Sequence, residues 1–188
     1  MPEPARLLLA LLGAAALAGC PLNYEEARVA QNISEEIPDT VLTRFTHTVV
    51  TGGKVWVRLS ADRAESYGKS KRITLSGVRF EEYDGAGRLV TEGRADRAVF
   101  HTDSENAEVS GDILIRAPEE KASLSAGRLA WTKDGKRLES GAGEFVRIAK
   151  EDGAFVEGRG LRADFRRRRL EFAEPVTGRF VEDAGGEP

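Results

Sequence analysis

The sequence predicts an all-β domain built from about four strand–turn–strand units. Beyond residue 40, apolar residues recur at every second position, as in residues 55–59 and 73–75, which is the period of half-buried strands. Asp-Gly pairs at residues 84, 134 and 152 favour tight turns between such strands. No stretch of that region keeps a 3.6-residue apolar period for three turns, so we expect no long helix there.

A repeat of about 33 residues underlies the alternation. Ala61-Asp62-Arg63-Ala64 recurs as Ala95-Asp96-Arg97-Ala98, and related segments begin at Gly127 and at Leu161. Each is followed by a polar turn and a second strand. Units of this kind bury their apolar faces against their neighbours, so the repeat predicts stacked sheet layers.

The composition excludes several classes of protein. The 28 Lys and Arg residues are balanced by 31 Asp and Glu residues, so the chain lacks the basic excess of a nucleic-acid binder. One Cys and two His residues are too few for a Cys/His zinc site or for a disulfide framework. We therefore expect no nucleic acid, no metal and no cofactor among the ligands.

The N-terminus has the features of a bacterial lipoprotein signal peptide. The apolar run of residues 7–18 would span about 18 Å as a helix, which is too short to cross a membrane. It ends in Leu17-Ala18-Gly19-Cys20, which matches the lipobox, and Cys20 is the only cysteine. The motif predicts lipidation of Cys20 and cleavage before it; the alternative is a buried free thiol next to a secretion signal. Two or more acyl chains on Cys20 would anchor the protein stably.

These signals divide the chain into four parts. Residues 1–19 are the predicted signal peptide, and residues 20–40 are the lipidated cysteine and a polar tether. The β domain is expected at residues 41–181, and the Gly-rich acidic residues 182–188 are expected to be a disordered tail.

No catalytic constellation is recognisable. The chain lacks the Gly-x-Ser-x-Gly, Walker and His-Glu-x-x-His patterns, and no thiol nucleophile remains once Cys20 is acylated. The sequence therefore predicts that the protein is not an enzyme.

Four consecutive arginines, residues 166–169, invite interpretation as an anion clamp. Aligning Phe165 with Trp131 and Leu170 with Leu138 places them over the turn of residues 133–136 instead. In that register they form a hairpin tip in solvent, and contact with a phosphorylated head group is the alternative.

Several segments together resemble the LptC family, which shares the OstA-like fold with LptA. They are Ile37-Pro38-Asp39 and residues 59–67, 73–78 and 158–163, in the family's order and spacing. The resemblance implies an open, twisted antiparallel β-jellyroll whose two sheets form a V. It also implies a lipopolysaccharide export bridge component. Such a protein accepts the glycolipid from an LptBFG-like ABC transporter and passes it to an LptA-like periplasmic protein.

The resemblance also implies where contacts would lie. Partner jellyrolls would pair with open edge strands, near residues 41–50 and 170–181. Family members usually hold the membrane by an uncleaved helix, whereas this chain carries a lipobox; we expect a periplasmic lipoprotein, with the inner membrane favoured over the outer. Alternating residues are candidates for a lipid-binding lining, and each is equally compatible with an ordinary core: Val55, Val57, Leu59, Ile73, Leu75, Val99, Val109, Ile113, Ile115, Leu129, Phe145, Phe155, Leu161, Phe165, Leu170 and Phe172.

One other function fits the same features. A membrane-anchored lipoprotein scaffold or adhesion module would use the same sheets without a lipid cargo. Crosslinking to glycolipid separates it from a carrier.

Overall fold

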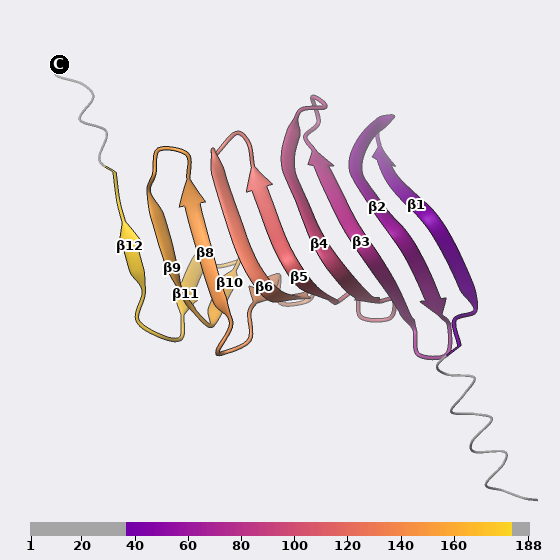
Figure 1. The fold of residues 1–188 in the computed structure, drawn as a ribbon. Coiled ribbons are helices and arrows are strands. Elements are labelled where there is room, and N and C mark those ends of the chain that lie inside the picture. The colour runs from indigo at the N-terminus through magenta and orange to yellow at the C-terminus, as the bar shows by residue number, and fades with distance from the viewer. Residues whose placement is uncertain (1–36, 182–188) are drawn as a thin grey trace, which may run out of the picture. The chain divides into compact units, whose positions relative to one another are not determined.

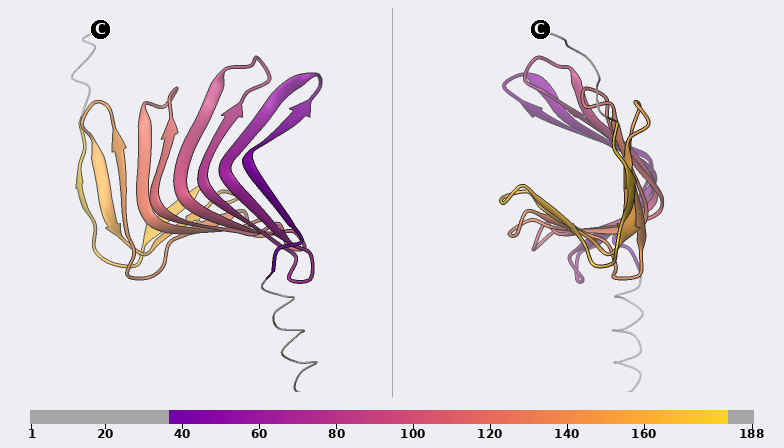
Figure 2. Two further views of the ribbon diagram at one scale, coloured as in Figure 1. Left: turned by 45° about the vertical axis from the view of Figure 1, so that its right-hand side comes forward. Right: turned by 90° about the vertical axis from the view of Figure 1, so that its left-hand side faces the viewer.

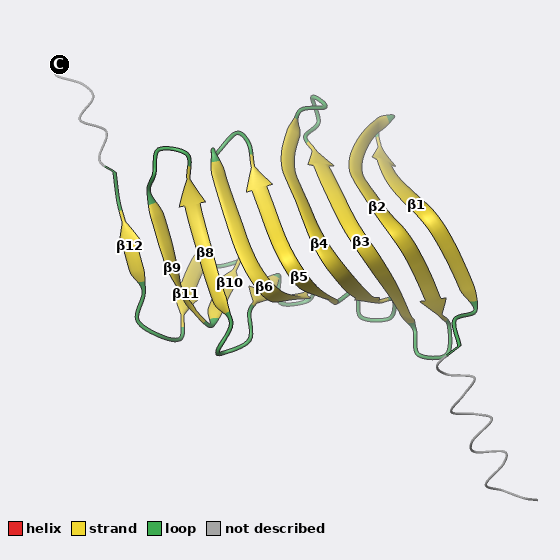
Figure 3. Cartoon of the chain, in the orientation of Figure 1, coloured by secondary structure: helices red, strands yellow, loops and turns green. Residues whose placement is uncertain are grey.

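The structure is a computed structural model that describes residues 37–181. These residues form one antiparallel sheet of 12 strands, which confirms the predicted all-β, open antiparallel fold (Figures 1 and 3). The strands are β1 (Thr40–Thr51), β2 (Lys54–Tyr67), β3 (Arg72–Tyr83), β4 (Leu89–His101), β5 (Ala107–Ala117), β6 (Ala122–Thr132), β7 (Arg137–Glu139), β8 (Phe145–Lys150), β9 (Phe155–Arg159), β10 (Leu161–Asp164), β11 (Arg169–Phe172) and β12 (Thr177–Arg179).

The sheet is folded into a V with two arms (Figure 2). Strands β1 to β6 pair in chain order, and the sheet then divides at β6. The first half of β6, residues 122–126, pairs with β8, which continues to β9 and β12. The second half, residues 130–132, pairs with β7, which continues to β10 and β11. We call the half of the sheet that ends in β12 arm 1 and the half that ends in β11 arm 2.

The Ala-Asp-Arg-Ala repeat forms the bend between the arms. Ala61 and Ala64 are both buried although they lie three positions apart, while Asp62 and Arg63 between them are exposed. Two consecutive residues therefore point outward at the bend, and the alternation of the strand changes phase there. Side chains converge on the inner side of a sharp bend, and alanine is small enough to pack there.

Glycines on the neighbouring strands complete the bend. Gly77 has φ of +62°, and a β-carbon on it would lie 2.1 Å from Asp62 Oδ2. In the next unit Gly111 has φ of +77° and faces Asp96 in the same way. Both the conformation and the close approach require glycine. The register aligns the two units as the repeat predicts, because Arg97 pairs with both Ser76 and Ser110.

The C-terminal strands build the same V differently. Strands β7 to β12 are short, each belongs to one arm, and the chain crosses between the arms at the vertex. At one crossing the N–H of Leu161 donates to Ser140 Oγ at 2.8 Å. At another, the N–H of Ala173 donates to the carbonyl oxygens of Arg159 and Gly160 at 3.0 and 3.1 Å. Hydrogen bonds from backbone and hydroxyl groups at these crossings thus join the two arms, as the backbone ladder of a continuous strand does in the first half of the sheet.

The predicted match between the last two hairpins is confirmed in part. The β10–β11 turn, residues 165–168, lies against the β6–β7 turn, because the N–H of Phe165 donates to the Lys136 carbonyl at 3.0 Å. All four arginines are exposed at this hairpin tip, as predicted. The expected alignment of Phe165 with Trp131 as equivalent positions of the two hairpins is two residues out of register. Ala163 takes that place opposite Leu170, just as Trp131 stands opposite Leu138.

Candidate functional site

The concave face of the V carries a continuous apolar row along arm 1. In this row each residue is the cross-strand partner of the next, from β2 to β9, and only a glycine interrupts the large side chains. Because partners across a ladder share a face, the row forms one wall of a trough between the arms. It consists of Leu59, Phe80, Gly93, Ile115, Leu124, Ile148 and Val156.

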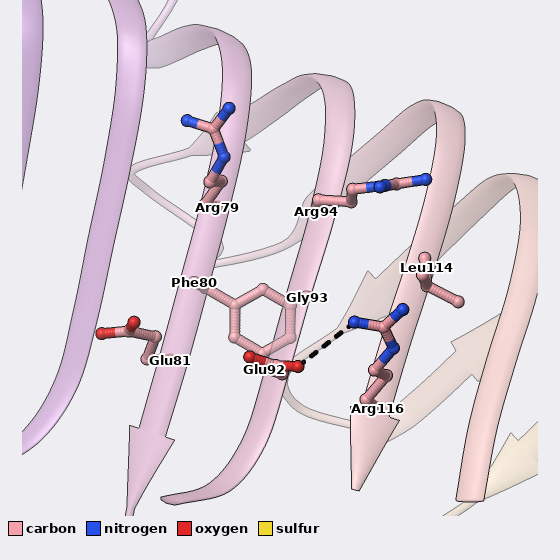
Figure 4. Close-up of a pocket in the computed structure, with 8 residues that line it drawn as sticks. All are labelled: Arg79, Phe80, Glu81, Glu92, Gly93, Arg94, Leu114 and Arg116. Atoms are coloured by element: carbon pink, nitrogen blue, oxygen red, sulfur yellow. Dashed lines mark ion pairs between the residues drawn. The ribbon is translucent and has the colours of Figure 1, made fainter.

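Phe80 covers the glycine in this wall. A β-carbon on Gly93 would lie 2.2 Å from Phe80 Cε1, so the ring occupies the space that a side chain would take. Figure 4 shows the ring beside Gly93. The wall is therefore continuous from β3 to β5.

Arm 2 carries two matching rows on the same face. The first consists of Ala64, Leu75, Ala98, Val109 and Leu129. The second lies nearer the turns and includes Ile73, Phe100, Ala107, Trp131, Leu138, Ala163 and Leu170.

Burial distinguishes the vertex of the trough from its walls. Ile113, Leu129, Val146 and Leu161 are at most 2% exposed, and all lie at or beside the bend. Residues of the walls, such as Ile115, are half-buried. The vertex is therefore packed protein core, whereas the walls present accessible apolar surface to whatever enters the V.

The convex face carries ion pairs. Arg58 pairs with Glu81 at 3.0 Å, and Arg147 pairs with Glu157. A shallow pocket on this face, drawn in Figure 4, is lined by charged side chains, including the pair formed by Arg116 and Glu92 at 3.5 Å. Phe80 and Gly93 of the apolar row also line this pocket, but its charged side chains lie on the face opposite the row, so its opening is not part of the trough.

Both ends of the sheet are open. Strand β1 pairs only with β2, β11 only with β10, and β12 only with β9 among the described residues. The single C-terminal edge expected at residues 170–181 is divided between the arms, because β11 lies in arm 2 and β12 in arm 1. Pro175 lies between these strands rather than within an edge strand. Large apolar side chains stay exposed beside these edges: Val41, Leu42, Val50, Leu170, Val176, Phe180 and Val181.

The described residues show neither a metal cluster nor a membrane helix. Within residues 37–181 no three His, Cys, Asp or Glu side chains are grouped so that they could hold a metal ion. No helix in that range is long and apolar enough to cross a membrane.

A comparison with protein families assigns the chain to a family. Residues 7–181 match the family described as "Lipopolysaccharide-assembly, LptC-related". The chain belongs to the LptC-related family. No curated protein matches the sequence.

Membership of the LptC-related family confirms the resemblance seen in the sequence. The protein has a role in lipopolysaccharide transport across the periplasm. It is a non-enzymatic transport bridge protein of the cell envelope. The predicted lipobox with Cys20, the signal peptide, most of the tether and the predicted tail lie outside the described residues.

Most of the predicted lining residues lie on the concave face. Those packed in the vertex are Leu75, Ile113, Leu129 and Leu161, and those on accessible walls are Val55, Val57, Leu59, Ile73, Val109, Ile115, Leu170 and Phe172.

Four predicted lining residues lie elsewhere. Val99 faces the convex side, because it pairs with Thr74 and Glu108. Phe145 and Phe155 also lie on the convex face, where the Arg147 guanidinium stands 4.3 Å from the centroid of the Phe155 ring. Phe165 lies in the β10–β11 turn, with its ring centroid 5.8 Å from that of Trp131. The phase change at the bend and the positions of turns, which simple alternation does not reveal, account for these differences.

Seven large apolar wall residues were missing from the sequence-based set. They all lie on the concave rows: Phe80, Phe100, Leu124, Trp131, Leu138, Ile148 and Val156. Local alternation would have found some of them: Phe80 follows Val78 by two positions, and Ile148 follows Val146 by two.

Proposed function

We propose that this chain accepts lipopolysaccharide from an inner-membrane ABC transporter and passes it along a bridge of β-jellyrolls. The observation that carries the proposal is the apolar row that runs unbroken from Leu59 to Val156 in an open V. An acyl chain of a dozen CH₂ groups exposes roughly 10 kcal/mol of apolar surface in water. A trough with apolar walls and open ends shields such chains and lets them move on.

The edge strands are the proposed contacts with neighbouring jellyrolls. Strands β1, β11 and β12 each leave one side of their backbone ladder open, and such edges favour addition of a partner strand. We assign β1 to the transporter side and the C-terminal edges to an LptA-like partner. Deleting residues 177–188 removes β12 but keeps Phe172 and Val176, which pack against Gly158. The truncated protein should lose the partner; unchanged affinity for it would contradict this assignment.

The proposed membrane attachment is a lipid on Cys20. The support is the lipobox and the absence of any other cysteine from the sequence. Mass spectrometry of the mature N-terminus should find diacylglycerol on Cys20, and the Cys20→Ser variant should keep residues 1–19. An unmodified Cys20 in the wild-type protein would contradict the anchor without affecting the trough.

Photocrosslinking of neighbouring residues tests the trough. Ile115 faces the concave side and Leu114 the convex side; both are half-buried apolar residues of β5. A photoreactive residue at Ile115 should crosslink to lipopolysaccharide during export, whereas one at Leu114 should not. Equal crosslinking at both positions, or none at either, would favour the scaffold without a lipid cargo.

A further inference from the structure

The two rims of the V differ in charge. The turns at the tips of arm 2 are residues 68–71, 102–106, 133–136 and 165–168, and they contain seven Lys or Arg residues against three Asp or Glu, a net charge of +4. The turns at the tips of arm 1 are residues 52–53, 84–88, 118–121 and 151–154, with two Lys or Arg residues against five Asp or Glu, a net charge of −3.

The arm-2 turns form one connected strip, which we call the basic rim. The N–H of Thr102 donates to the Lys71 carbonyl at 2.8 Å. The N–H of Lys133 donates to Asn106 Oδ1 at 3.0 Å, and its ammonium pairs with Glu105. With the contact already described between the last two turns, all four turns are linked. The cations are thus presented on an ordered surface, which reduces the conformational entropy that binding would cost.

Three cations of the basic rim occupy backbone positions that suit glycine. Lys71, Lys136 and Arg168 have φ of +47°, +45° and +52°. L-residues rarely adopt this conformation, and glycine would be accommodated without strain. On arm 1, glycine fills four of the five turn positions with positive φ, at residues 52, 53, 87 and 153, and Lys121 fills the fifth. A long basic side chain at these positions does not stabilise the turn. What it adds there is positive charge.

Several of these cations have no internal partner. Lys71, Lys136, Arg166 and Arg168 are exposed and make no ion pair with another described residue. Arg167 approaches Asp164 only to 3.9 Å. These side chains remain available for an external anion.

We propose that the basic rim binds the phosphorylated head group of the glycolipid whose acyl chains lie in the trough. This deepens, and rests on, the carrier function proposed above. Only Ala64 to Tyr67 separate the vertex from the rim on β2 of arm 2, about 13 Å, so a head group at the mouth of the V comes within reach of these side chains. Arginine and lysine bind phosphate oxygens by charge-assisted hydrogen bonds, whereas the acidic arm-1 rim repels phosphate groups. The glycolipid is thereby held in one orientation across the V.

The test uses glycine substitutions that relieve backbone strain while removing charge. The full-length variant Lys71→Gly/Lys136→Gly/Arg168→Gly should melt at or above the wild-type temperature. Its affinity for purified phosphorylated lipid A should fall on the order of tenfold, since each exposed contact contributes two- to fivefold. Its affinity for the enzymatically dephosphorylated lipid should not change.

Lys136→Gly and Lys121→Gly are a matched pair on opposite rims. Their φ angles are +45° and +49°, and each N–H closes a four-residue turn, to Lys133 and Pro118 respectively. Lys136→Gly should weaken binding of the phosphorylated lipid about two- to threefold, whereas Lys121→Gly should not.

The possible failures are distinguishable. Equal affinity of the wild-type protein for both lipids would overturn the rim proposal and leave the trough intact. The triple variant could instead lose as much affinity for phosphatidylglycerol vesicles as for phosphorylated lipid A. That result would assign the rim to a membrane surface and would also overturn the rim proposal. If neither lipid binds and the Ile115 probe does not crosslink, the carrier function itself fails.

Discussion

The long strands β1 to β6 and the short strands β7 to β12 build the same V by different means. In the first region each strand runs through the vertex, so the ladder itself holds both arms in register. In the second, the arms separate, and a few groups around Ser140, Gly160 and Ala173 join them. Local opening requires the loss of fewer hydrogen bonds in the second region. We therefore expect the C-terminal region to open at lower free energy than the long strands.

The largest effect is expected from Leu161→Ala. Leu161 is fully buried where the chain enters arm 2, so truncation should lower the free energy of unfolding by about 4 kcal/mol. Urea denaturation measures this loss. Hydrogen exchange should show that β7, β10 and β11 lose protection while β2 to β5 keep theirs.

Leu170→Ala is the control for that variant. Leu170 is 48% exposed on the edge strand, so the same truncation should cost below about 1 kcal/mol. If Leu161→Ala reduced protection equally in all strands, the two regions would form one cooperative unit and the comparison would be wrong.

The next effect tests the continuous bend. Gly77→Ala should cost about 2–3 kcal/mol, because alanine is strained at φ of +62° and its β-carbon meets the Asp62 carboxylate. Asp62→Ala in the same chain should restore the steric part of the loss and leave the backbone strain. Thermal unfolding of the single and double variants measures the coupling.

Gly160 provides the contrast in the C-terminal region. A β-carbon there would lie 2.7 Å from Ala173 Cβ and 3.1 Å from the Ala142 carbonyl oxygen. The Ala142 carbonyl belongs to the backbone, which no side-chain substitution removes, so Ala173→Gly should rescue Gly160→Ala only in part. A full rescue of Gly77→Ala by Asp62→Ala would show that strain at positive φ contributes little to the bend.

The sequence predicted the strands, the turns and the repeat, because these depend on local periodicity. Alternation identified Ile73, Leu75, Ile113 and Ile115 as one face, and the repeat matched residues 61–64 with residues 95–98, which both lie at the bend. Strands, turns and the repeat involve contacts between residues of one 33-residue unit or of two adjacent units.

The features that the sequence did not predict depend on long-range pairing. The division of the sheet at β6 follows from which strand adds to each half, and this also divides the C-terminal edge. Val99 was placed on the wrong face because Ala95 and Ala98 both point inward across the bend. The opposite charges of the two rims could not be seen either, since only the folded strands show which turns share a rim.

A smaller effect is expected from Ser140→Ala. The Ser140 hydroxyl accepts the N–H of Leu161 at 2.8 Å in a half-buried position, and its loss should cost about 1–2 kcal/mol. Hydrogen exchange should locate the change at Leu161 and the start of β10. Ser123→Ala is the control, because the Ser123 hydroxyl makes only a 3.5 Å contact with the Ala149 carbonyl. Equal losses in both variants would mean that the crossing does not depend on this hydrogen bond.

The smallest effect is expected from Asp84→Asn, in the turn between two long strands. The backbone N–H of Arg88 donates to Asp84 Oδ1 at 2.9 Å and the Arg88 guanidinium pairs with Oδ2, which lowers the pKa of Asp84 below its usual value. Asp152, in the β8–β9 turn, accepts one backbone N–H, from Ala154. Asp152→Asn should therefore shift Tm less than Asp84→Asn at pH 7.

The pH dependence of Asp84→Asn follows from the direction of that shift. Because the carboxyl binds its proton more weakly in the folded chain, its ionised form stabilises the fold above about pH 4, the unfolded pKa. This contribution is lost as the pH falls through the lower, folded pKa. Melting curves from pH 7 to pH 2.5 should show the difference in Tm between wild type and Asp84→Asn shrinking at the acid end. A difference that stayed constant over this range would mean that the Asp84 side chain acts by geometry alone. In that case its hydrogen bonds, which the amide can still partly make, would stabilise the turn without its charge.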